Sequence, residues 1–149
     1  MGIFSQVSQR VAKFLTMLYA YWYMCMMSVD PKMLKHVHWV GSSRRDLKTF
    51  PREVQRDIGQ ALYAAQRGEE YPSVKALKGF GGRSILEIVA IAAAGTYRTV
   101  YTVRFQEAIY VLHAFQKKSK KGIATPQTEL ELIRKRLLDA EQDYRRRQN

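Results

Sequence analysis

The chain has 149 residues, a length that suits one domain with an appendage, and its 46% hydrophobic and 11% aromatic content excludes a wholly disordered protein. Its 25 Lys and Arg outnumber 13 Asp and Glu, and the net charge of +12 points to a polyanionic partner such as nucleic acid or an anionic membrane. A single cysteine, Cys25, excludes a disulfide framework and a cysteine zinc site within one chain, so we expect a cytoplasmic protein.

Residues 1–33 are expected to form a hydrophobic N-terminal extension, separate from a compact domain at 34–149. Residues 14–27 carry no charge, but this run is shorter than the roughly 20 residues that span a bilayer, so no stable membrane span is expected. A signal peptide is disfavoured because no small-x-small cleavage site follows. Three interpretations stay open: an extra packed helix, an interfacial helix, or upstream sequence added by a wrong start site.

The compact domain is expected to begin with a strand and two helices. Residues 36–40 alternate in polarity and stop at a glycine, as a short strand does. Ser42 or Ser43 is placed to cap a short helix, with Asp46 in the capping-box position for Ser43. Pro51 suits the first turn of a second helix, which stops at Gly68. The apolar residues of that second helix recur at helical spacing: Val54, Ile58, Ala61, Leu62 and Ala65.

A glycine-rich loop at 75–82 is expected next, followed by strands at 84–91, 97–104 and 109–115. The connectors between these strands are short, so we expect an antiparallel meander, because parallel neighbours need a crossover of about a dozen residues. Thr125 as cap and Pro126 at the first position open a last helix. Its apolar stripe steps by three and four residues: Leu130, Ile133, Leu137, Ala140 and Tyr144. The predicted fold class is therefore α+β.

Basic residues concentrate between residues 71 and 125, where nine Lys and Arg stand against two acids, Glu87 and Glu107. The strongest local signal is the end of the third strand of the meander, which runs into Lys117, Lys118, Lys120 and Lys121. Cleavage of RNA needs a group that takes the proton of the ribose 2′-hydroxyl, cations that stabilise the phosphorane, and an acid for the leaving 5′ oxygen. Lys and Arg suit the phosphorane, His113 is a candidate for proton transfer, and Phe115 or Tyr101 can stack on an unpaired base. The alternative is a solvated basic hairpin end.

Two further features have competing interpretations. Glu87 lies among apolar residues and is either catalytic or, as we expect, paired with Arg98 across the sheet, since a part-buried charge requires a partner. His36 and His38 share a strand face but lack a third ligand nearby, so no metal site is expected. No nucleotide-binding loop or zinc motif is found, and no cofactor is expected.

Residues 38–144 resemble the phage-related, HigB-like branch of the RelE/ParE superfamily of type II toxin–antitoxin toxins. The segments that carry the resemblance, through their order and spacing, are 39–43 (WVGSS), 77–82 (LKGFGG), 86–88 (LEI), 97–101 (YRTVY) and 113–121 (HAFQKKSKK). The resemblance implies a small antiparallel sheet with two N-terminal helices and a C-terminal helix. It also implies a metal-independent endoribonuclease that cuts ribosome-bound mRNA, inhibits translation, and is neutralised by a cognate antitoxin, expected to be a helix-turn-helix protein.

The resemblance also assigns site residues. Arg98 matches the sheet arginine at the scissile phosphate, Lys117 and Lys118 match the basic residues that end the last strand, and Lys78 matches the basic residue before the glycine-rich loop. Together with His113, the first three are the expected catalytic residues. The expected RNA-binding residues are Lys78, Arg83, Tyr101, Phe115, Lys120 and Lys121. Because the superfamily includes gyrase poisons, a non-catalytic gyrase inhibitor or an inactive nucleic-acid-binding protein is the alternative. Residues 90–94 (AIAAA) depart from the family's usually polar loop.

Overall fold

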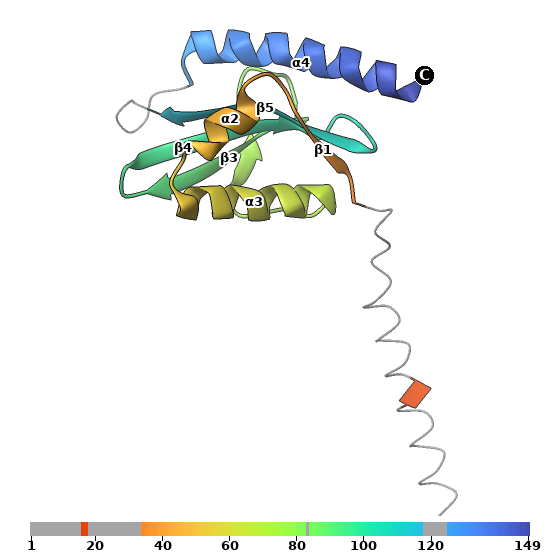
Figure 1. The fold of residues 1–149 in the computed structure, drawn as a ribbon, viewed down its shortest axis with the longest axis horizontal. Helices are drawn as coiled ribbons and strands as arrows, with labels where there is room; N and C mark the ends of the chain where they lie inside the picture. The colour runs from red at the N-terminus through yellow and green to blue at the C-terminus, as the bar shows by residue number, and fades with distance from the viewer. Residues whose placement is uncertain (1–15, 18–33, 83, 118–124) are drawn as a thin grey trace, which may run out of the picture. The chain divides into compact units, whose positions relative to one another are not determined.

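The computed structural model describes residues 16–17, 34–82, 84–117 and 125–149 of the chain (Figure 1). Contacts divide the chain into two units, Met1–Leu34 and Lys35–Asn149. In the first unit only Thr16 and Met17, both helical, and Leu34 are described. The extension predicted at 1–33 therefore lies almost entirely outside the described residues. Within the described part of the chain, no helix has both the length and the apolar character needed to cross a membrane.

A five-stranded sheet in the order β1-β5-β4-β3-β2 forms the centre of the second unit. Its strands are β1 (His36–Trp39), β2 (Val74–Ala76), β3 (Ile85–Ala92), β4 (Gly95–Thr102) and β5 (Ala108–Lys117). Neighbouring strands run antiparallel except β1, which pairs with β5 in parallel. The predicted α+β class and the antiparallel meander of β3, β4 and β5 are confirmed.

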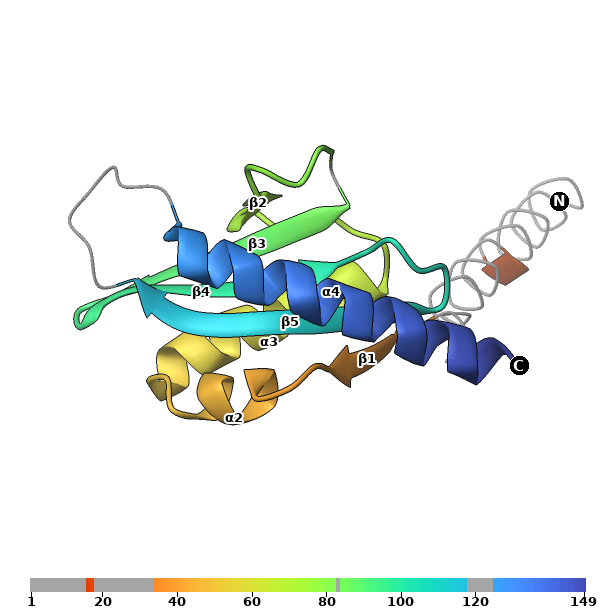
Figure 2. The same ribbon diagram turned by 90° about the horizontal axis from the view of Figure 1, so that it is seen from above.

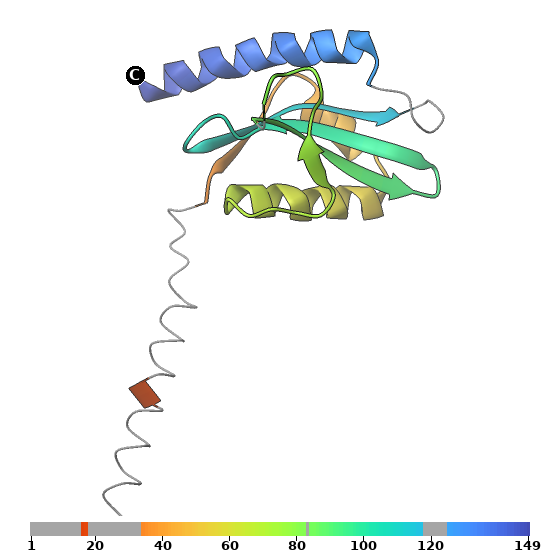
Figure 3. The same ribbon diagram turned by 180° about the vertical axis from the view of Figure 1, so that it is seen from behind.

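The helices described in the second unit are α2 (Ser43–Lys48), α3 (Arg52–Gln66) and α4 (Gln127–Gln148). Figures 1 and 3 show α3 against one face of the sheet and α4 against the other. The short helix α2 packs on β5, where the hydroxyl of Ser43 donates a 3.0 Å hydrogen bond to the carbonyl of Val111. The sheet is therefore the middle layer of a three-layer domain.

One core cluster lies between α3 and the sheet. The apolar stripe predicted for the second helix faces the strands, and all five of its members are buried. These residues pack against alternate strand positions, which include Ile88, Tyr97, Tyr101, Ile109 and Val111. Gly68, with φ +73°, follows the end of α3 and serves as the predicted stop.

A second core cluster lies between α4 and the opposite face of the sheet. Ile133, Leu137 and Ala140 of the predicted stripe are buried against strand residues that alternate with those of the α3 face. Near the C-terminal end of α4, Asp143 accepts hydrogen bonds from Arg147 at 2.6 Å and from the Tyr110 hydroxyl at 2.8 Å. The bond from Arg147, together with that from Tyr110, lowers the pKa of Asp143. Apolar packing and charged hydrogen bonds thus hold α4 along its length.

The segment between α3 and β3 differs from the prediction. We expected a loop from residue 75, but Val74–Ala76 forms the short edge strand β2, antiparallel to β3. The alanine-rich segment, in contrast, forms a simple hairpin, because Ala92 pairs with Gly95 and only Ala93 and Ala94 remain in the turn.

The predicted helix caps are confirmed in part. Ser42, at the N-cap of α2, donates its hydroxyl to the Asp46 side chain at 2.6 Å and makes no capping bond to the backbone, while Ser43 lies inside the helix. Pro126, and not Thr125, is the N-cap of α4. The hydroxyl of Thr125 instead lies 3.4 Å from a guanidinium nitrogen of Arg98, at the edge of the sheet face that α4 covers.

The packing of α4 gives a direct test of the fold. Ile133 is fully buried, whereas Leu138 on the same helix is 59% exposed. We expect Ile133→Ala to lower the free energy of unfolding by about 2–5 kcal/mol, because buried methyl groups are lost and a cavity remains. Leu138→Ala is the matched control and is expected to change it by less than about 0.5 kcal/mol. Urea unfolding followed by circular dichroism measures both, and equal effects would contradict the packing of α4 on the sheet.

Candidate nucleic-acid interface

A basic groove opens on the α4 face of the sheet, beside the start of α4. It has a cavity volume of about 570 Å³, and its walls come from four strands, the loop after β2 and the first turn of α4. The lining residues are Lys75, Ala76, Leu77, Lys78, Gly79, Glu87, Arg98, Lys117, Thr125 and Leu130. Four of these are cations and one is an acid, so the groove suits an anionic ligand such as a phosphate.

Strand register brings the charged residues of the groove together. Lys75 on β2 pairs directly with Glu87 on β3, and Arg98 on β4 pairs with Val89, two positions beyond Glu87 on the same face. Lys117 on β5 lies opposite Thr96, which is two positions from Arg98. Four adjacent strands therefore each contribute one charged side chain to the same sheet face.

Arg98 and Glu87 form the centre of the groove. The Nη1 of Arg98 donates a 2.7 Å hydrogen bond to Glu87 Oε2, and the two side chains are only 12% and 6% exposed. Lys75 Nζ approaches the other carboxylate oxygen at 3.7 Å from the solvent side. The Nε of Arg98 is buried and has no hydrogen-bond partner among the described residues. The predicted pairing of Glu87 with Arg98 is confirmed, and one N–H donor of the guanidinium stays unpaired among the described residues.

Lys78 reaches the groove from the glycine-rich loop, which is held on both sides. Leu77 is buried in the core under α4, and its N–H donates a 3.0 Å hydrogen bond to the carbonyl of Ile85. Arg134 of α4 lies over the ring of Phe80, 5.2 Å from its centroid. Three residues assigned from the resemblance, Arg98, Lys117 and Lys78, thus meet in one groove. The remaining assigned cations, Arg83, Lys118, Lys120 and Lys121, lie outside the described residues.

His113 does not line the groove, which argues against the predicted role in proton transfer. Its ring is buried under α4, where Nε2 makes a hydrogen bond with the Glu129 carboxylate and Nδ1 lies 3.1 Å from Arg136 Nη1. A guanidinium can only donate, so Nδ1 must accept and the proton of the neutral ring sits on Nε2, pointing at Glu129. Both ring nitrogens therefore contact side chains of α4. The structure gives His113 a structural role in place of the predicted catalytic one.

Arg136 connects α4 to the rest of the domain. Besides His113, its guanidinium donates to the Leu112 carbonyl at 2.9 Å and to the Ser42 hydroxyl at 2.7 Å. Gly41, with φ +56°, gives the guanidinium room, because a Cβ there would lie 3.0 Å from Arg136 Nε. One buried cation thus ties α4 to β5 and to the start of α2, and it fixes the helix whose first turn borders the groove.

The two aromatic candidates also lie outside the groove. Tyr101 is 2% exposed and sits on the α3 face, because it is three positions from Arg98 on β4 and side chains alternate. Burial raises its pKa to about 12. Phe115 shares the α4 face but is half-buried and stacks on the His113 ring, with centroids 5.0 Å apart. The prediction that Tyr101 stacks on a base is therefore wrong for this fold, and Phe115 is engaged in packing.

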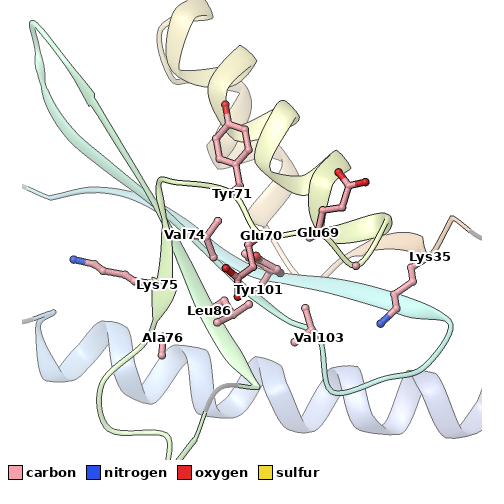
Figure 4. A pocket seen from close by; sticks show the side chains of 12 residues that line it. Lys35, Glu69, Glu70, Tyr71, Val74, Lys75, Ala76, Leu86, Tyr101 and Val103 are labelled. Atoms are coloured by element: carbon pink, nitrogen blue, oxygen red, sulfur yellow. The ribbon is translucent and has the colours of Figure 1, made fainter.

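A second hollow lies on the α3 face, beside the end of α3. Figure 4 shows the apolar lining residues Val74, Leu86, Tyr101 and Val103, with the acidic residues Glu69 and Glu70 also in the lining. Lys35 and Lys75 are the cations among its lining residues. Equal numbers of acids and cations make this hollow a poorer phosphate site than the groove.

The two strand histidines do not line the groove. The ring centroids of His36 and His38 are 6.4 Å apart, and the His38 ring lies at a tilt against the Tyr110 ring, with centroids 4.9 Å apart. Burial, followed by the nearby positive charge of Arg147, lowers the pKa of His38. In the part of the chain that the structure describes, no group of three or more His, Cys, Asp or Glu is placed to hold a metal ion.

The family model described as phage derived protein Gp49-like (DUF891) matches residues 45–138, more than half of the chain. The chain belongs to this family. This match confirms the resemblance to the phage-related part of the RelE/ParE superfamily that the sequence indicated. The finer assignment to the HigB-like branch stays a prediction.

Two solved structures are similar to the Gp49-like chain. A mutant of the Escherichia coli toxin RelE in the free state aligns with a TM-score of 0.46 and 14% identity, over 58% of this chain and 86% of that one. The toxin–antitoxin complex RelBE2 from Mycobacterium tuberculosis aligns with a TM-score of 0.41 and 18% identity, over 60% of this chain and 99% of the matched one. Curated protein sequences give no match.

Sequence reasoning missed part of the groove of this Gp49-like protein. Lys75 was counted among the basic residues but given no role, and Thr125 and Leu130 were seen only as helix residues. The pairing of Lys75 with Glu87 depends on β2, whose three residues are too few to show a strand pattern. The first turn of α4 lies close to β4, and local sequence patterns do not predict such contacts between distant segments.

The anchoring role of Arg136 can be tested against its neighbour in the helix. We expect Arg136→Met to lower the free energy of unfolding by about 3 kcal/mol, because the buried acceptors of Leu112, His113 and Ser42 lose their donor. Lys135→Met, at an exposed position, is the matched control and is expected to change it by less than about 0.5 kcal/mol. Thermal and urea unfolding measure both variants. A stability for Arg136→Met equal to that of the control would show that the buried network does not hold α4.

Proposed function

We propose that this Gp49-like protein is the toxin of a type II toxin–antitoxin system and an endoribonuclease that cuts ribosome-bound mRNA in the groove under α4. One observation carries the proposal: four adjacent strands place Lys75, Glu87, Arg98 and Lys117 on a single sheet face. The proposal includes action in the cytoplasm and neutralisation by a cognate antitoxin. The RelBE2 structure, which contains a toxin with its antitoxin, agrees with such a partner.

The groove holds the groups that RNA transesterification needs. In this reaction the ribose 2′-oxygen loses its proton and attacks the adjacent phosphorus, and the bond from phosphorus to the 5′ oxygen breaks as that oxygen gains a proton. The products are a 2′,3′-cyclic phosphate and a 5′-hydroxyl. No water or metal is consumed in this sequence.

Arg98 is assigned to the phosphate. Its fork of N–H groups stabilises the charge that grows on the phosphorane oxygens, and its low exposure strengthens the interaction because little water competes. A phosphate that accepts from Arg98 competes with Glu87 for the same guanidinium. Binding of RNA therefore loosens the Arg98–Glu87 bond and frees a carboxylate beside the scissile bond.

Glu87 is assigned as the acceptor of the 2′-hydroxyl proton. It is the acidic residue among those that line the groove, and its carboxylate lies within 2.7 Å of the group that would hold the phosphate. Lys117, from the end of β5, is assigned to the leaving 5′ oxygen. Lys78, from the glycine-rich loop, is assigned to the flanking phosphates. Lys118 stays a candidate for the same role, although it lies outside the described residues.

Arg98→Lys tests the assignment to the phosphate. The variant keeps a charge beside Glu87 but loses the bidentate fork, so we expect cleavage of ribosome-bound mRNA to slow by about 10²–10³-fold. Arg145→Lys, at an exposed position near the C-terminal end of α4, is the control and is expected to keep full activity. Single-turnover cleavage of end-labelled mRNA on purified ribosomes measures the rates. A folded Arg98→Lys variant that cleaves at the wild-type rate would remove Arg98 from the site.

Glu87→Gln separates catalysis from binding. The amide oxygen still accepts from Arg98, but it does not take a proton, so cleavage is expected to fall by about 10²–10⁴-fold. The groove also loses its negative charge, so RNA affinity is expected to stay equal or to rise. Single-turnover rates, beside binding of a non-cleavable 2′-O-methyl RNA, give the two readouts. Loss of binding in parallel with loss of cleavage would show that Glu87 only supports the fold of the groove.

A further inference from the structure

A second cluster of cations lies away from the groove, on α2 and the first turns of α3. We call it the α2–α3 basic face and define it as Arg44, Arg45, Lys48, Arg52 and Arg56. All five residues are exposed. Of these, only Arg45 makes an ion pair among the described residues, at 3.7 Å from Asp46. The other four cations have no recorded carboxylate partner in the part of the chain that the structure describes.

The two helices that carry this face are held together at their junction. The side-chain amide of Gln55 on α3 donates to the carbonyl of Lys48 at 3.1 Å and to that of Phe50 at 2.7 Å. The inward sides of both helices are occupied by Ser43 on α2 and by the buried stripe of α3. The cations therefore project from a rigid surface and not from a loose loop.

Folding alone does not explain where these cations stand. Arg52 is the first residue of α3 and Arg56 lies one turn further, where the positive end of the helix dipole disfavours cations. Local ion pairing does not offset this cost, because neither arginine has a recorded carboxylate partner among the described residues. A position that is unfavourable for the free protein is typical of residues that serve a binding surface.

The outer side of α3 continues this surface with an aromatic residue. Tyr63 is 49% exposed, and the guanidinium of Arg67 lies over its ring, 5.9 Å from the centroid. Arginines with an exposed tyrosine are the side chains that bind phosphates and stack on bases. The apolar stripe of α3 is buried against the sheet, so this helix has no apolar side with which to enter a membrane.

We propose that the α2–α3 basic face is a second RNA-binding surface, which binds the phosphate backbone of folded RNA without base-specific contacts. Figure 2 shows α2 on the β5 side of the sheet, whereas the groove reaches across to β2 on the face that α4 covers. None of the five cations lines the groove, so the two surfaces contact different nucleotides of any bound RNA. This inference goes beyond the proposed function, because binding at this face needs no cleavage.

The experiment compares two variants of the full chain with equal net charge. The first changes Arg44, Lys48, Arg52 and Arg56 to Gln. The control changes four exposed cations outside both surfaces to Gln: Arg104, Lys135, Arg145 and Arg146. The probe is a 2′-O-methyl RNA hairpin, and its affinity is measured by fluorescence anisotropy at several salt concentrations. Circular dichroism melting checks folding, and the first variant is expected to melt no lower than wild type because it relieves the repulsion at the start of α3.

We expect the first variant to bind the hairpin at least tenfold more weakly, with a slope of log affinity against log salt that is shallower by about 3, as four lost phosphate contacts imply. The control is expected to change the slope by less than about 1. Equal changes in both variants would overturn the proposal, because net charge alone would then explain binding. Unchanged hairpin binding with loss of binding to phosphatidylserine vesicles, or to an acidic protein, would also overturn it.

Cleavage provides a separate readout. At saturating protein, the first variant is expected to cut ribosome-bound mRNA at the wild-type single-turnover rate, since the groove is unchanged. If wild-type protein cuts no RNA but the two variants differ in hairpin binding as stated, the proposed function fails and this inference stands. If cleavage proceeds and the variants bind alike, the inference fails and the proposed function stands.

Discussion

Arg98 and Glu87 carry opposite charges into a part of the sheet that α4 shields from water, and each depends on the other. A buried charge without a partner destabilises a protein by several kcal/mol, roughly 3–5 where one member of a pair is removed, so the fold constrains both residues together. The same pair organises the groove, because Lys75 makes an ion pair with the Glu87 carboxylate and Thr125 accepts a hydrogen bond from the Arg98 guanidinium. The ion pair that stabilises the free protein therefore lies in the groove, where we propose that a phosphate competes with Glu87 for the Arg98 guanidinium.

The helix α4 gives this pair its environment. Its first turn borders the groove, its middle is tied to β5 and α2 through Arg136, and its last turns are held by Asp143 and Tyr110. His113 belongs to this anchoring network and not to the chemistry. Loss of the anchor would expose the Arg98–Glu87 pair to water and weaken its electrostatic interaction, since charges interact less strongly at high dielectric. Helix docking and the properties of the site are therefore coupled.

Local patterns in the sequence were sufficient for most elements of the fold. The alternation in β3, β4 and β5 and the helical spacing in α3 and α4 report directly which side of each element is buried. The parallel pairing of β1 with β5 and the short strand β2 were missed, because the partners lie far apart in the chain and β2 has only three residues.

The candidate site was predictable where the family resemblance named a residue and where the part-buried charge of Glu87 required a partner. Arg98, Lys117 and Lys78 do meet in one groove. Tyr101 and His113 were assigned from chemistry alone, and the structure places Tyr101 on the opposite sheet face and His113 against partners 16 and 23 positions along the chain. Side-chain chemistry shows what a residue can do, whereas register and helix docking decide what it faces.

The end chemistry of the cut RNA tests the central claim most directly, which is that the groove around Arg98 and Glu87 performs transesterification. Wild-type protein is incubated with ribosomes that carry a defined mRNA, and the ends of both fragments are determined by enzymatic labelling. The account predicts a 2′,3′-cyclic phosphate on the upstream fragment and a 5′-hydroxyl on the downstream fragment. Fragments with 5′-phosphate ends, or intact mRNA in the presence of folded protein, would contradict it.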